Sequence, residues 1–205
     1  HALSDPLIGK TALVSSFGAE SIVLLHVISH IDNATPIIFL NTEMLFEQTL
    51  RYQREVTDYL NLTDVRVVSP TRESLILHDV DNLLHQVFLN KCCDLRKTRP
   101  LEIALQEFGG WITGRKRYQN GQRAHLPLFE KQGGKIKINP LASWDTTSVN
   151  DYITINNLPR HPLVAQGFPS IGCRSCTTKA KEHEPPRAGR WRGKPKTECG
   201  IHFDD

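Results

Sequence analysis

The chain has 205 residues, 39% of them hydrophobic, and a formal net charge of +3 at pH 7. This length and apolar content suffice for one sizeable core, while the small net charge disfavours a general nucleic-acid binder. No apolar run approaches the roughly 18 residues that a membrane span needs, and the N-terminus lacks the zones of a signal peptide. The sequence therefore predicts a cytoplasmic protein that partners neither nucleic acid nor a membrane.

Short apolar runs alternate with helical patterns over the first two-thirds of the chain. Five runs are predicted strands: 11–16, 36–42, 64–70, 109–115 and 135–142. Apolar spacing predicts helices after residue 21 and over 45–60, and two more helical stretches before residue 109. This alternation predicts an α/β fold with a mainly parallel, doubly wound sheet covered on both faces. Ligands in such folds bind at the carboxyl ends of the strands.

The composition changes near residue 159 to proline, glycine, cysteine and basic residues. The last part has too few apolar residues to pack a core of its own. We therefore divide the chain into a main domain at 1–184, which contains four of the five cysteines, and an irregular, mobile C-terminal tail at 185–205. The tail is expected to close over the ligand site.

The segment Ser15–Ser21, SSFGAES, joins the first predicted strand to the first helix. Small residues such as Ser16 and Gly18 let backbone N–H groups approach a ligand, and the following helix N-terminus favours a phosphate. An ordinary tight turn is the alternative, because the segment fits neither the Walker pattern nor GxGxxG. It resembles the modified phosphate loop of the ATP-pyrophosphatase-like proteins, which implies a sheet of that adenine-nucleotide-binding type.

Basic residues gather at two further places. Arg115 and Arg123 lie in WITGRKRYQNGQR, which leaves a predicted strand end, and their guanidinium groups match phosphate or sulfate oxygens. A solvated basic loop is the alternative. Before Cys199 the tail has a single nearby acid, Glu198, and five basic residues: Arg187, Arg190, Arg192, Lys194 and Lys196. Because cationic neighbours raise the thiolate fraction, Cys199 is a candidate nucleophile, with a spare surface thiol as the alternative.

The five cysteines fall into two pairs and one single residue. An odd number argues against a disulfide framework in a reducing compartment. Cys173 and Cys176 have the CxxC spacing that lets two sulfurs converge on a metal centre. Adjacent Cys92 and Cys93 cannot readily form an unstrained disulfide with each other. Four thiolates fit zinc or a [4Fe-4S] cluster, and the spacing does not choose between them.

Seven segments occur in this order along the chain: SSFGAES, FLNTEMLFEQT, CCDLRK, WITGRKRYQ, LPRHPLVAQGFPSIGCRSC, RAGRW and KTECGIH. With them the chain resembles the thioredoxin-dependent adenylyl-sulfate (APS) and phosphoadenylyl-sulfate (PAPS) reductases of assimilatory sulfate reduction. The similarity runs through almost the whole chain. It implies reductive cleavage of APS to sulfite and AMP, with a [4Fe-4S] cluster on Cys92, Cys93, Cys173 and Cys176.

The resemblance also implies roles for single residues. The implied substrate contacts are Ser15, Ser16, Gly18 and Ser21 along the phosphate loop, Asn41 and Thr42 at the nucleotide pocket, and Arg123, Arg187 and Arg190 at the phosphate and sulfate. Lys97 would lie between cluster and substrate, and Cys199 would be the nucleophile with His202 close by. Asn41 stands where the family commonly has Asp, and residues 118–120 read Tyr-Gln-Asn instead of Asp-Gln-Ser.

A count of thiols predicts the source of electrons. If Cys199 attacks the sulfur of bound APS, AMP leaves and an S-sulfo-cysteine remains on the enzyme. With the other four cysteines on a cluster, no thiol of the chain is left to release sulfite. Thioredoxin or glutaredoxin must therefore supply the thiol that releases sulfite. The sequence leaves open whether the chain forms a homo-oligomer.

Three alternatives remain. The substrate could be PAPS, or both nucleotides, although the two cysteine pairs usually accompany APS in this family. A tRNA sulfur-insertion ATP pyrophosphatase also combines a phosphate loop with a cysteine-bound cluster, but it needs an RNA-binding extension that we do not find in the sequence. A non-catalytic, zinc-stabilised nucleotide sensor would leave the Cys199 tail without a purpose.

Overall fold

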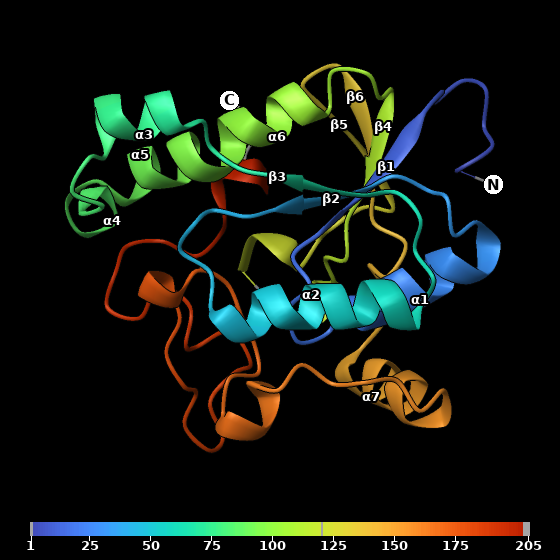
Figure 1. Ribbon diagram of the computed structural model, residues 1–205. Coiled ribbons are helices and arrows are strands. Elements are labelled where there is room, and N and C mark those ends of the chain that lie inside the picture. Colours follow the sequence, from blue (N-terminus) through green and yellow to red (C-terminus); the bar gives the residue numbers. More distant parts are fainter. Residues whose placement is uncertain (1, 120, 203–205) are drawn as a thin grey trace.

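The computed structural model describes residues 2–119 and 121–202, so residues 1, 120 and 203–205, the last of these in the predicted tail, lie outside the described residues. One sheet has the strand order β3-β2-β1-β4-β6-β5 (Figure 1). Its strands are β1 (Thr11–Ser15), β2 (Ile37–Leu40), β3 (Val65–Val68), β4 (Gly110–Ile112), β5 (Phe129–Gln132) and β6 (Lys135–Ile138). Only the β5–β6 pair is antiparallel within this sheet. The predicted mainly parallel sheet is confirmed, and β5 is an additional edge strand.

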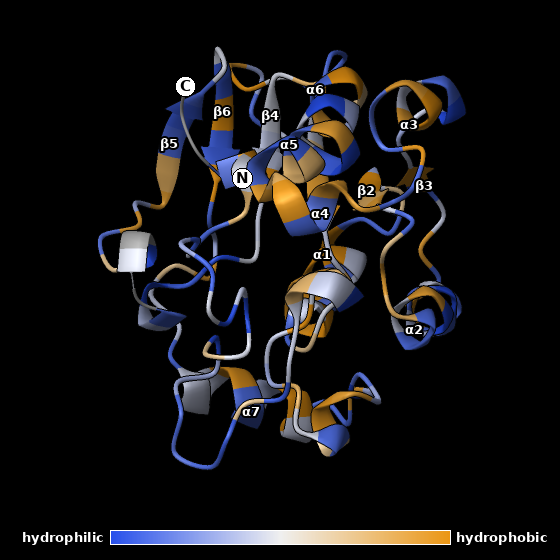
Figure 2. Cartoon of the chain, turned by 90° about the vertical axis from the view of Figure 1, so that its left-hand side faces the viewer, coloured by the Kyte–Doolittle hydropathy of each residue, from blue (hydrophilic) through white to orange (hydrophobic). Residues whose placement is uncertain are grey.

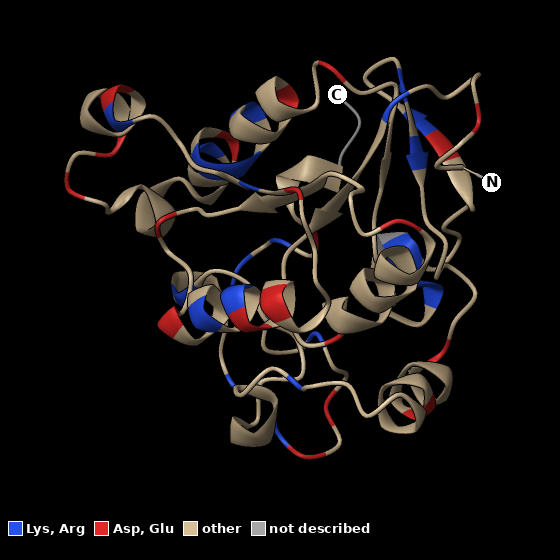
Figure 3. Cartoon of the chain, turned by 45° about the vertical axis from the view of Figure 1, so that its right-hand side comes forward, with Lys and Arg blue, Asp and Glu red and all other residues tan. Residues whose placement is uncertain are grey.

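Helices cover both faces of the sheet, as predicted. In chain order they are α1 (Ser21–Ile31), α2 (Glu47–Tyr59), α3 (Arg72–His78), α4 (Leu84–Val87), α5 (Leu89–Cys93), α6 (Arg99–Ala104) and α7 (Thr146–Ile155). Helices α1, α2 and α7 lie on one side, and α6 lies on the other with α3, α4 and α5 beside it (Figure 1). Hydrophilic and hydrophobic residues occur on different sides of α2 (Figure 2). Acidic and basic residues are interspersed over the helices (Figure 3), in keeping with the small net charge.

The core is split by the sheet into two clusters because successive side chains of a strand point to opposite faces. Leu13 of β1 packs with residues of α1, α2 and α7, whereas its neighbour Ala12 packs with Leu101 and Leu105 at α6. Leu13 also pairs in register with Ile37 of β2 and Ile112 of β4. Strand β1 is therefore buried on both faces and between two neighbours.

The strand order creates a crevice beside β1. The chain builds β2 and β3 on one side of β1, and then crosses to place β4, β6 and β5 on the other. Loops leaving β1 and β4 thus diverge at their carboxyl ends, where open α/β sheets bind ligands. This is where the predicted phosphate loop and the predicted basic segment begin.

Residues 89–104 form one helical run with a wider turn in its middle. A π-helix, η1 (Asp94–Thr98), joins α5 to α6. Pro100, in the first turn of α6, has no N–H to donate to the carbonyl of Arg96, and the run widens just before it. Cys92 and Cys93 end α5, and Lys97 lies within the π turn. Such turns occur often at functional sites.

The described part of the chain after α7 contains no α-helix or sheet strand, only short 3-10 turns, at Val164–Gln166, Arg174–Cys176 and Gly200–His202. Single bridges tie Cys173 to Leu45 and Arg190 to Thr177. The irregular character predicted for the tail is present, whereas its mobility stays a prediction. Across the ranges that the structure describes, no helix is both long and apolar enough to cross a membrane.

Candidate active site

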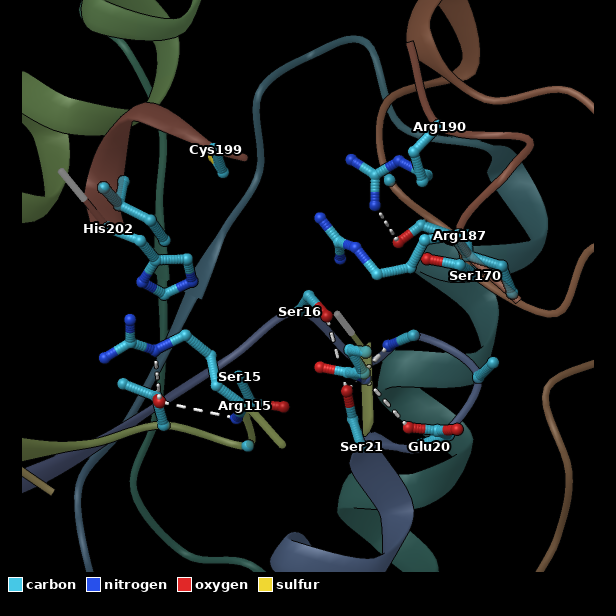
Figure 4. Close-up of a pocket in the computed structure, with 18 of the residues that line it drawn as sticks. Ser15, Ser16, Glu20, Ser21, Arg115, Ser170, Arg187, Arg190, Cys199 and His202 are labelled. Atoms are coloured by element: carbon cyan, nitrogen blue, oxygen red, sulfur yellow. Dashed lines mark hydrogen bonds between the residues drawn. The ribbon is translucent and has the colours of Figure 1, made fainter. Parts of the chain in front are cut away.

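A pocket opens at the carboxyl ends of β1 and β4, where the strand order predicts a ligand crevice. The phosphate loop forms its floor, and the segment after β4, residues 169–172 and the tail form its walls. In Figure 4, Cys199 and His202 lie on one side of the hollow and Arg187 and Arg190 on the other. Segments more than 180 residues apart in the sequence, from Ser15 to His202, therefore meet in one site.

Side chains and backbone of the phosphate loop hold one another in place. The Ser21 hydroxyl accepts a hydrogen bond from the N–H of Gly18 at 3.0 Å and lies 3.3 Å from the hydroxyl of Ser16. The backbone N–H of Phe17 donates to the Ser15 hydroxyl. Phe17 has a φ of 46°, a left-handed conformation uncommon for a bulky residue, and its fully buried ring packs edge-on against Phe39. The core thus fixes the turn of the loop.

Glu20 joins this loop to the segment that follows β4. Its carboxylate accepts hydrogen bonds from Lys116 Nζ at 2.8 Å, from Gln119 Nε2 at 3.2 Å and from the hydroxyl of Tyr118. Lys116 is 2% exposed, and burial lowers its pKa although Glu20 opposes the shift. A buried lysine needs such a partner, so Glu20 sets the path of residues 116–119.

Arg115 reaches the pocket from the carboxyl end of β4. Its Nε donates to the Thr113 hydroxyl at 3.3 Å and its Nη2 to Asn139 Oδ1 at 3.2 Å, and the guanidinium is paired with Glu130. Three neighbours thus orient a cation that is 7% exposed. A fixed, buried guanidinium at this place presents positive charge to the pocket.

Arg187 and Arg190 supply the opposite wall. Burial, together with the nearby charge of Arg123, lowers the pKa of Arg187 to about 10. Arg190 lies over the ring of Trp191, 4.4 Å from its centroid, and its buried Nε has no hydrogen-bond partner among the described residues. Gly172 makes room for this side chain, because a Cβ there would lie 2.9 Å or less from three atoms of the Arg190 guanidinium. The site is thus rich in cations.

The described end of the tail enters the pocket. Cys199 is 8% exposed, and its neighbour Glu198 forms an ion pair with Arg123. His202 stacks on Trp111 with the rings 4° from parallel, and its buried Nδ1 has no hydrogen-bond partner within the described chain. Burial, followed by the charges of Lys137 and Arg123, holds the pKa of His202 well below its ordinary value. At neutral pH this imidazole is therefore uncharged.

The two cysteine pairs meet at a second, smaller cavity next to the first. All four thiols are free and buried, and they line this cavity: Cys92, Cys93, Cys173 and Cys176. The Thr42 hydroxyl lies 3.3 Å from Cys173 Sγ. Burial raises the pKa of Cys92 to about 12. Among the described residues, no group of three or more His, Cys, Asp or Glu side chains is placed to hold a metal ion.

Lys97 lines both cavities, from its place in the π turn. Burial acts to lower its pKa, but the sulfurs of Cys173 and Cys199 outweigh this, and the pKa lies above its ordinary value. The ammonium group therefore stays charged between the cysteine pairs and the phosphate loop. The expected position of Lys97 between a cluster and the substrate stays a prediction.

The pocket brings together most of the residues expected at the substrate, namely Ser15, Ser16, Gly18, Ser21, Arg115, Arg123, Arg187 and Arg190. Asn41 and Thr42 are not among its described lining residues. Asn41 accepts a hydrogen bond from the N–H of Glu43, and Thr42 faces Cys173. The sequence analysis assigned no role to Glu20, which belongs to the same loop motif, or to Glu198, which directly precedes Cys199.

The fold and pocket define a class: an adenine-nucleotide-type α/β protein with a cation-lined pocket and a thiol carried on a C-terminal tail. Residues 10–179 match the phosphoadenosine phosphosulfate reductase domain. The chain is 48% identical to the adenosine 5'-phosphosulfate reductase of Mesorhizobium japonicum, over 95% of this chain and 76% of that one. It is 37% identical to the enzyme of that name from Mycobacterium tuberculosis, over 88% and 72%. The chain belongs to the APS/PAPS reductase family.

Solved structures agree with this assignment. The phosphoadenylyl-sulfate reductase of Candida auris, in a phosphate complex, superposes with a TM-score of 0.70 and 30% identity over 82% of this chain and 83% of that one. The FMN adenylyltransferase of Candida glabrata superposes with a TM-score of 0.60 over 98% and 70%. At 15% identity, the second likeness shows the fold alone.

Proposed function

We propose that this chain reduces APS to sulfite and AMP in assimilatory sulfate reduction, with Cys199 as the nucleophile. The observation that carries the proposal is the meeting of the Cys199 thiol with the phosphate loop and with Arg187 and Arg190 in one pocket. APS brings a phosphate and a sulfate to such a site, and guanidinium groups match the oxygens of both. The names of the relatives at 48% and 37% identity support APS as the substrate.

Each step can be assigned to residues of the chain. The Cys199 thiolate attacks the sulfur of APS, the bond from that sulfur to the phosphate oxygen breaks, and AMP leaves with the electron pair. Arg187, Arg190 and Lys97 stabilise the charge that spreads over the departing phosphate and the sulfo group. Uncharged His202 lines this side of the pocket, and its Nδ1, which has no partner among the described residues, is available for one hydrogen bond to the substrate.

A dithiol protein such as thioredoxin or glutaredoxin completes the cycle. One of its thiolates attacks Cys199 Sγ, sulfite leaves, and a mixed disulfide forms; its second thiol then releases Cys199 as the dithiol becomes a disulfide. Two electrons thus pass from the partner to the sulfur. We propose that the tail at 185–205 moves away from the domain at 1–184 for this step, since Cys199 is buried in the closed form.

Four cysteines fit a [4Fe-4S] cluster in this scheme. Such clusters take four cysteine thiolates, and four buried thiols from two distant segments line one small cavity: Cys92, Cys93, Cys173 and Cys176. When bound, the cluster would add negative charge beside Lys97 and tune the sulfate end of the pocket. Free reactive thiols and a cluster both suit the reducing cytoplasm, where we place the reaction.

Sulfite release tests the proposal. The protein is purified without oxygen and its iron content is measured. It is then assayed with APS or with PAPS and excess reduced thioredoxin, and a Cys199→Ser variant is assayed in the same way. We expect sulfite from APS far faster than from PAPS, and none from Cys199→Ser although it still binds AMP. Equal turnover of PAPS would replace the APS assignment by dual specificity. Absence of sulfite from both nucleotides, with iron present, would refute the reductase.

A further inference from the structure

The carboxylate of Glu198, immediately before the nucleophile, is held on both oxygens. It is 4% exposed. Its Oε1 accepts hydrogen bonds from the backbone N–H of Cys199 and from Arg123 Nη2, each at 2.8 Å, and its Oε2 accepts one from Arg123 Nε. A bidentate pair of this kind fixes orientation as well as distance. The position of the Glu198 carboxylate therefore sets the position of the Cys199 backbone.

Arg123 is held in turn from its other side. Its Nη1 donates to Gln119 Oε1, and Gln119 Nε2 donates to Glu20 Oε2 at 3.2 Å. Glu20 directly precedes α1 and belongs to the phosphate loop. An unbroken series of hydrogen bonds thus runs from the phosphate loop to the backbone of Cys199.

We propose that Glu198 is a positioning residue, which docks Cys199 at the pocket through Arg123 and Gln119. This inference rests on the proposed role of Cys199 as the nucleophile. Burial acts to raise the pKa of Glu198, but its hydrogen bond with Arg123 outweighs burial and the pKa lies below the ordinary value. The carboxylate is therefore charged at neutral pH, as the pair requires.

A rival reading of the same contact predicts a different result. Arg187 Nη2 also approaches Glu198 Oε1, at 3.4 Å, so the carboxylate could be occupying an anion site that substrate takes over. In that case Glu198 competes with the nucleotide, and removing its charge tightens the binding of AMP. If Glu198 positions the thiol, its removal leaves AMP binding unchanged and frees Cys199.

Alkylation of Cys199 in the holoenzyme measures docking without any turnover. Iodoacetamide is added to the wild type, Glu198→Gln and Arg123→Gln, and the modified peptide containing residue 199 is quantified by mass spectrometry. We expect both variants to react at least about tenfold faster, because a weakened ion pair lets the buried thiol open more often. Glu184→Gln is the matched control, since Glu184 pairs with Arg192 at the protein surface. Unchanged rates in both variants would overturn the proposal.

Kinetics separate positioning from substrate binding. For Glu198→Gln we expect kcat for sulfite release to fall about tenfold, with KM for APS and Kd for AMP unchanged. The kcat of Glu198→Asp should lie between those of Glu198→Gln and the wild type. A tighter Kd for AMP, or a raised KM at unchanged kcat, would contradict the positioning role. If the wild type itself releases no sulfite, the proposed function fails, while the alkylation rates still decide whether Glu198 docks the tail.

Discussion

Arg96 and Asp79 form an ion pair in which both side chains are almost completely buried. Arg96 Nε and Nη2 donate to Asp79 Oδ2 at 3.0 and 2.6 Å, and Nη1 donates to the carbonyl of Thr42 at 2.9 Å. Thr42 in turn lies against Cys173. A single arginine therefore connects the π turn that carries Lys97 to the loop that supports the second cysteine pair.

Breaking this pair should destabilise the protein strongly. We expect Arg96→Met to lower the free energy of unfolding by about 3 to 5 kcal/mol, because Asp79 is left as a buried charge without its partner. The double variant with Asp79→Leu should lose less than the sum of the two single changes. Urea unfolding measures both. As a control, Arg99→Ala removes an exposed pair with Asp94 in the same helical run and should cost less than about 1 kcal/mol.

Lys97→Ala should greatly lower turnover without loss of iron. Lys97 lines both the cysteine cavity and the larger pocket, so its removal takes away positive charge where we propose that the sulfo group reacts. We expect kcat to fall at least about a hundredfold while the visible absorbance and iron content stay at wild-type levels. Lys91→Ala, which changes an exposed lysine of α5, should leave both quantities unaltered. Wild-type turnover in Lys97→Ala would refute the proposal that Lys97 stabilises charge during the reaction.

Gly172→Ala should weaken substrate binding because it displaces the Arg190 guanidinium. An added methyl group would collide with the Arg190 guanidinium, which must move or turn away from the pocket. We expect KM for APS to rise about tenfold while the melting temperature changes by only a few degrees. Gly114→Ala is the comparison within the same pocket, because a Cβ there would meet only Leu24, at 3.8 Å. Equal KM values for the two variants would refute this role of Gly172.

Buried His161 should make the protein less stable in mild acid. Its Nδ1 accepts the N–H of Leu163 and its Nε2 lies 3.0 Å from the Thr49 hydroxyl, so the neutral ring is satisfied and protonation would break a contact. Burial lowers its pKa from 6.5 to about 4. Below pH 6.5, His161 of the unfolded chain therefore binds a proton, whereas His161 of the folded chain stays neutral until the pH nears 4. The stability contributed by the neutral ring is complete above pH 6.5 and is lost as the pH falls toward 4.

Thermal unfolding between pH 7.5 and 4.5 measures this effect. His161→Asn keeps an acceptor near the Nδ1 position but does not titrate, so its melting temperature should fall less over this range than that of the wild type. His183→Asn changes an exposed histidine and should follow the wild-type curve. Parallel curves for the wild type and His161→Asn would rule out the contribution of His161.

The sheet could be predicted because its central strands are short apolar runs bounded by turn residues. Strand β5 was missed, since only one of its four residues, FEKQ, is apolar and its side chains are alternately exposed, as befits an edge strand. Helix α7 was also missed. Its sequence, TTSVNDYITI, is rich in β-branched and polar residues of low helix propensity, and Asp145 at its N-terminus accepts the N–H of Ser148. Tertiary packing of Val149 and Ile153 stabilises it.

Sequence patterns single out residues that line the pocket, but they do not predict which of these residues pair with one another. The loop of small residues, the arginines and the tail cysteine each carry a local pattern, and they do line one pocket. The contact of Arg123 with Glu198 spans 75 residues, and that of Lys116 with Glu20 spans 96. No local pattern encodes such contacts, because the strand order and the path of the tail determine them. The same reason explains why Thr42 lies against a cysteine instead of in the pocket.

Two tryptophans, Trp111 stacked on the tail and Trp191 within it, give the protein built-in fluorescent reporters. Trp111 stacks on His202 of the tail, and Trp191 lies under Arg190, whereas Trp144 packs against Tyr152. Indole emission is sensitive to nearby cations and imidazole rings, so tail opening should change the intrinsic fluorescence of the unlabelled enzyme. Stopped-flow mixing with reductant could therefore time the motion of the tail directly, with Trp111→Phe separating the two signals.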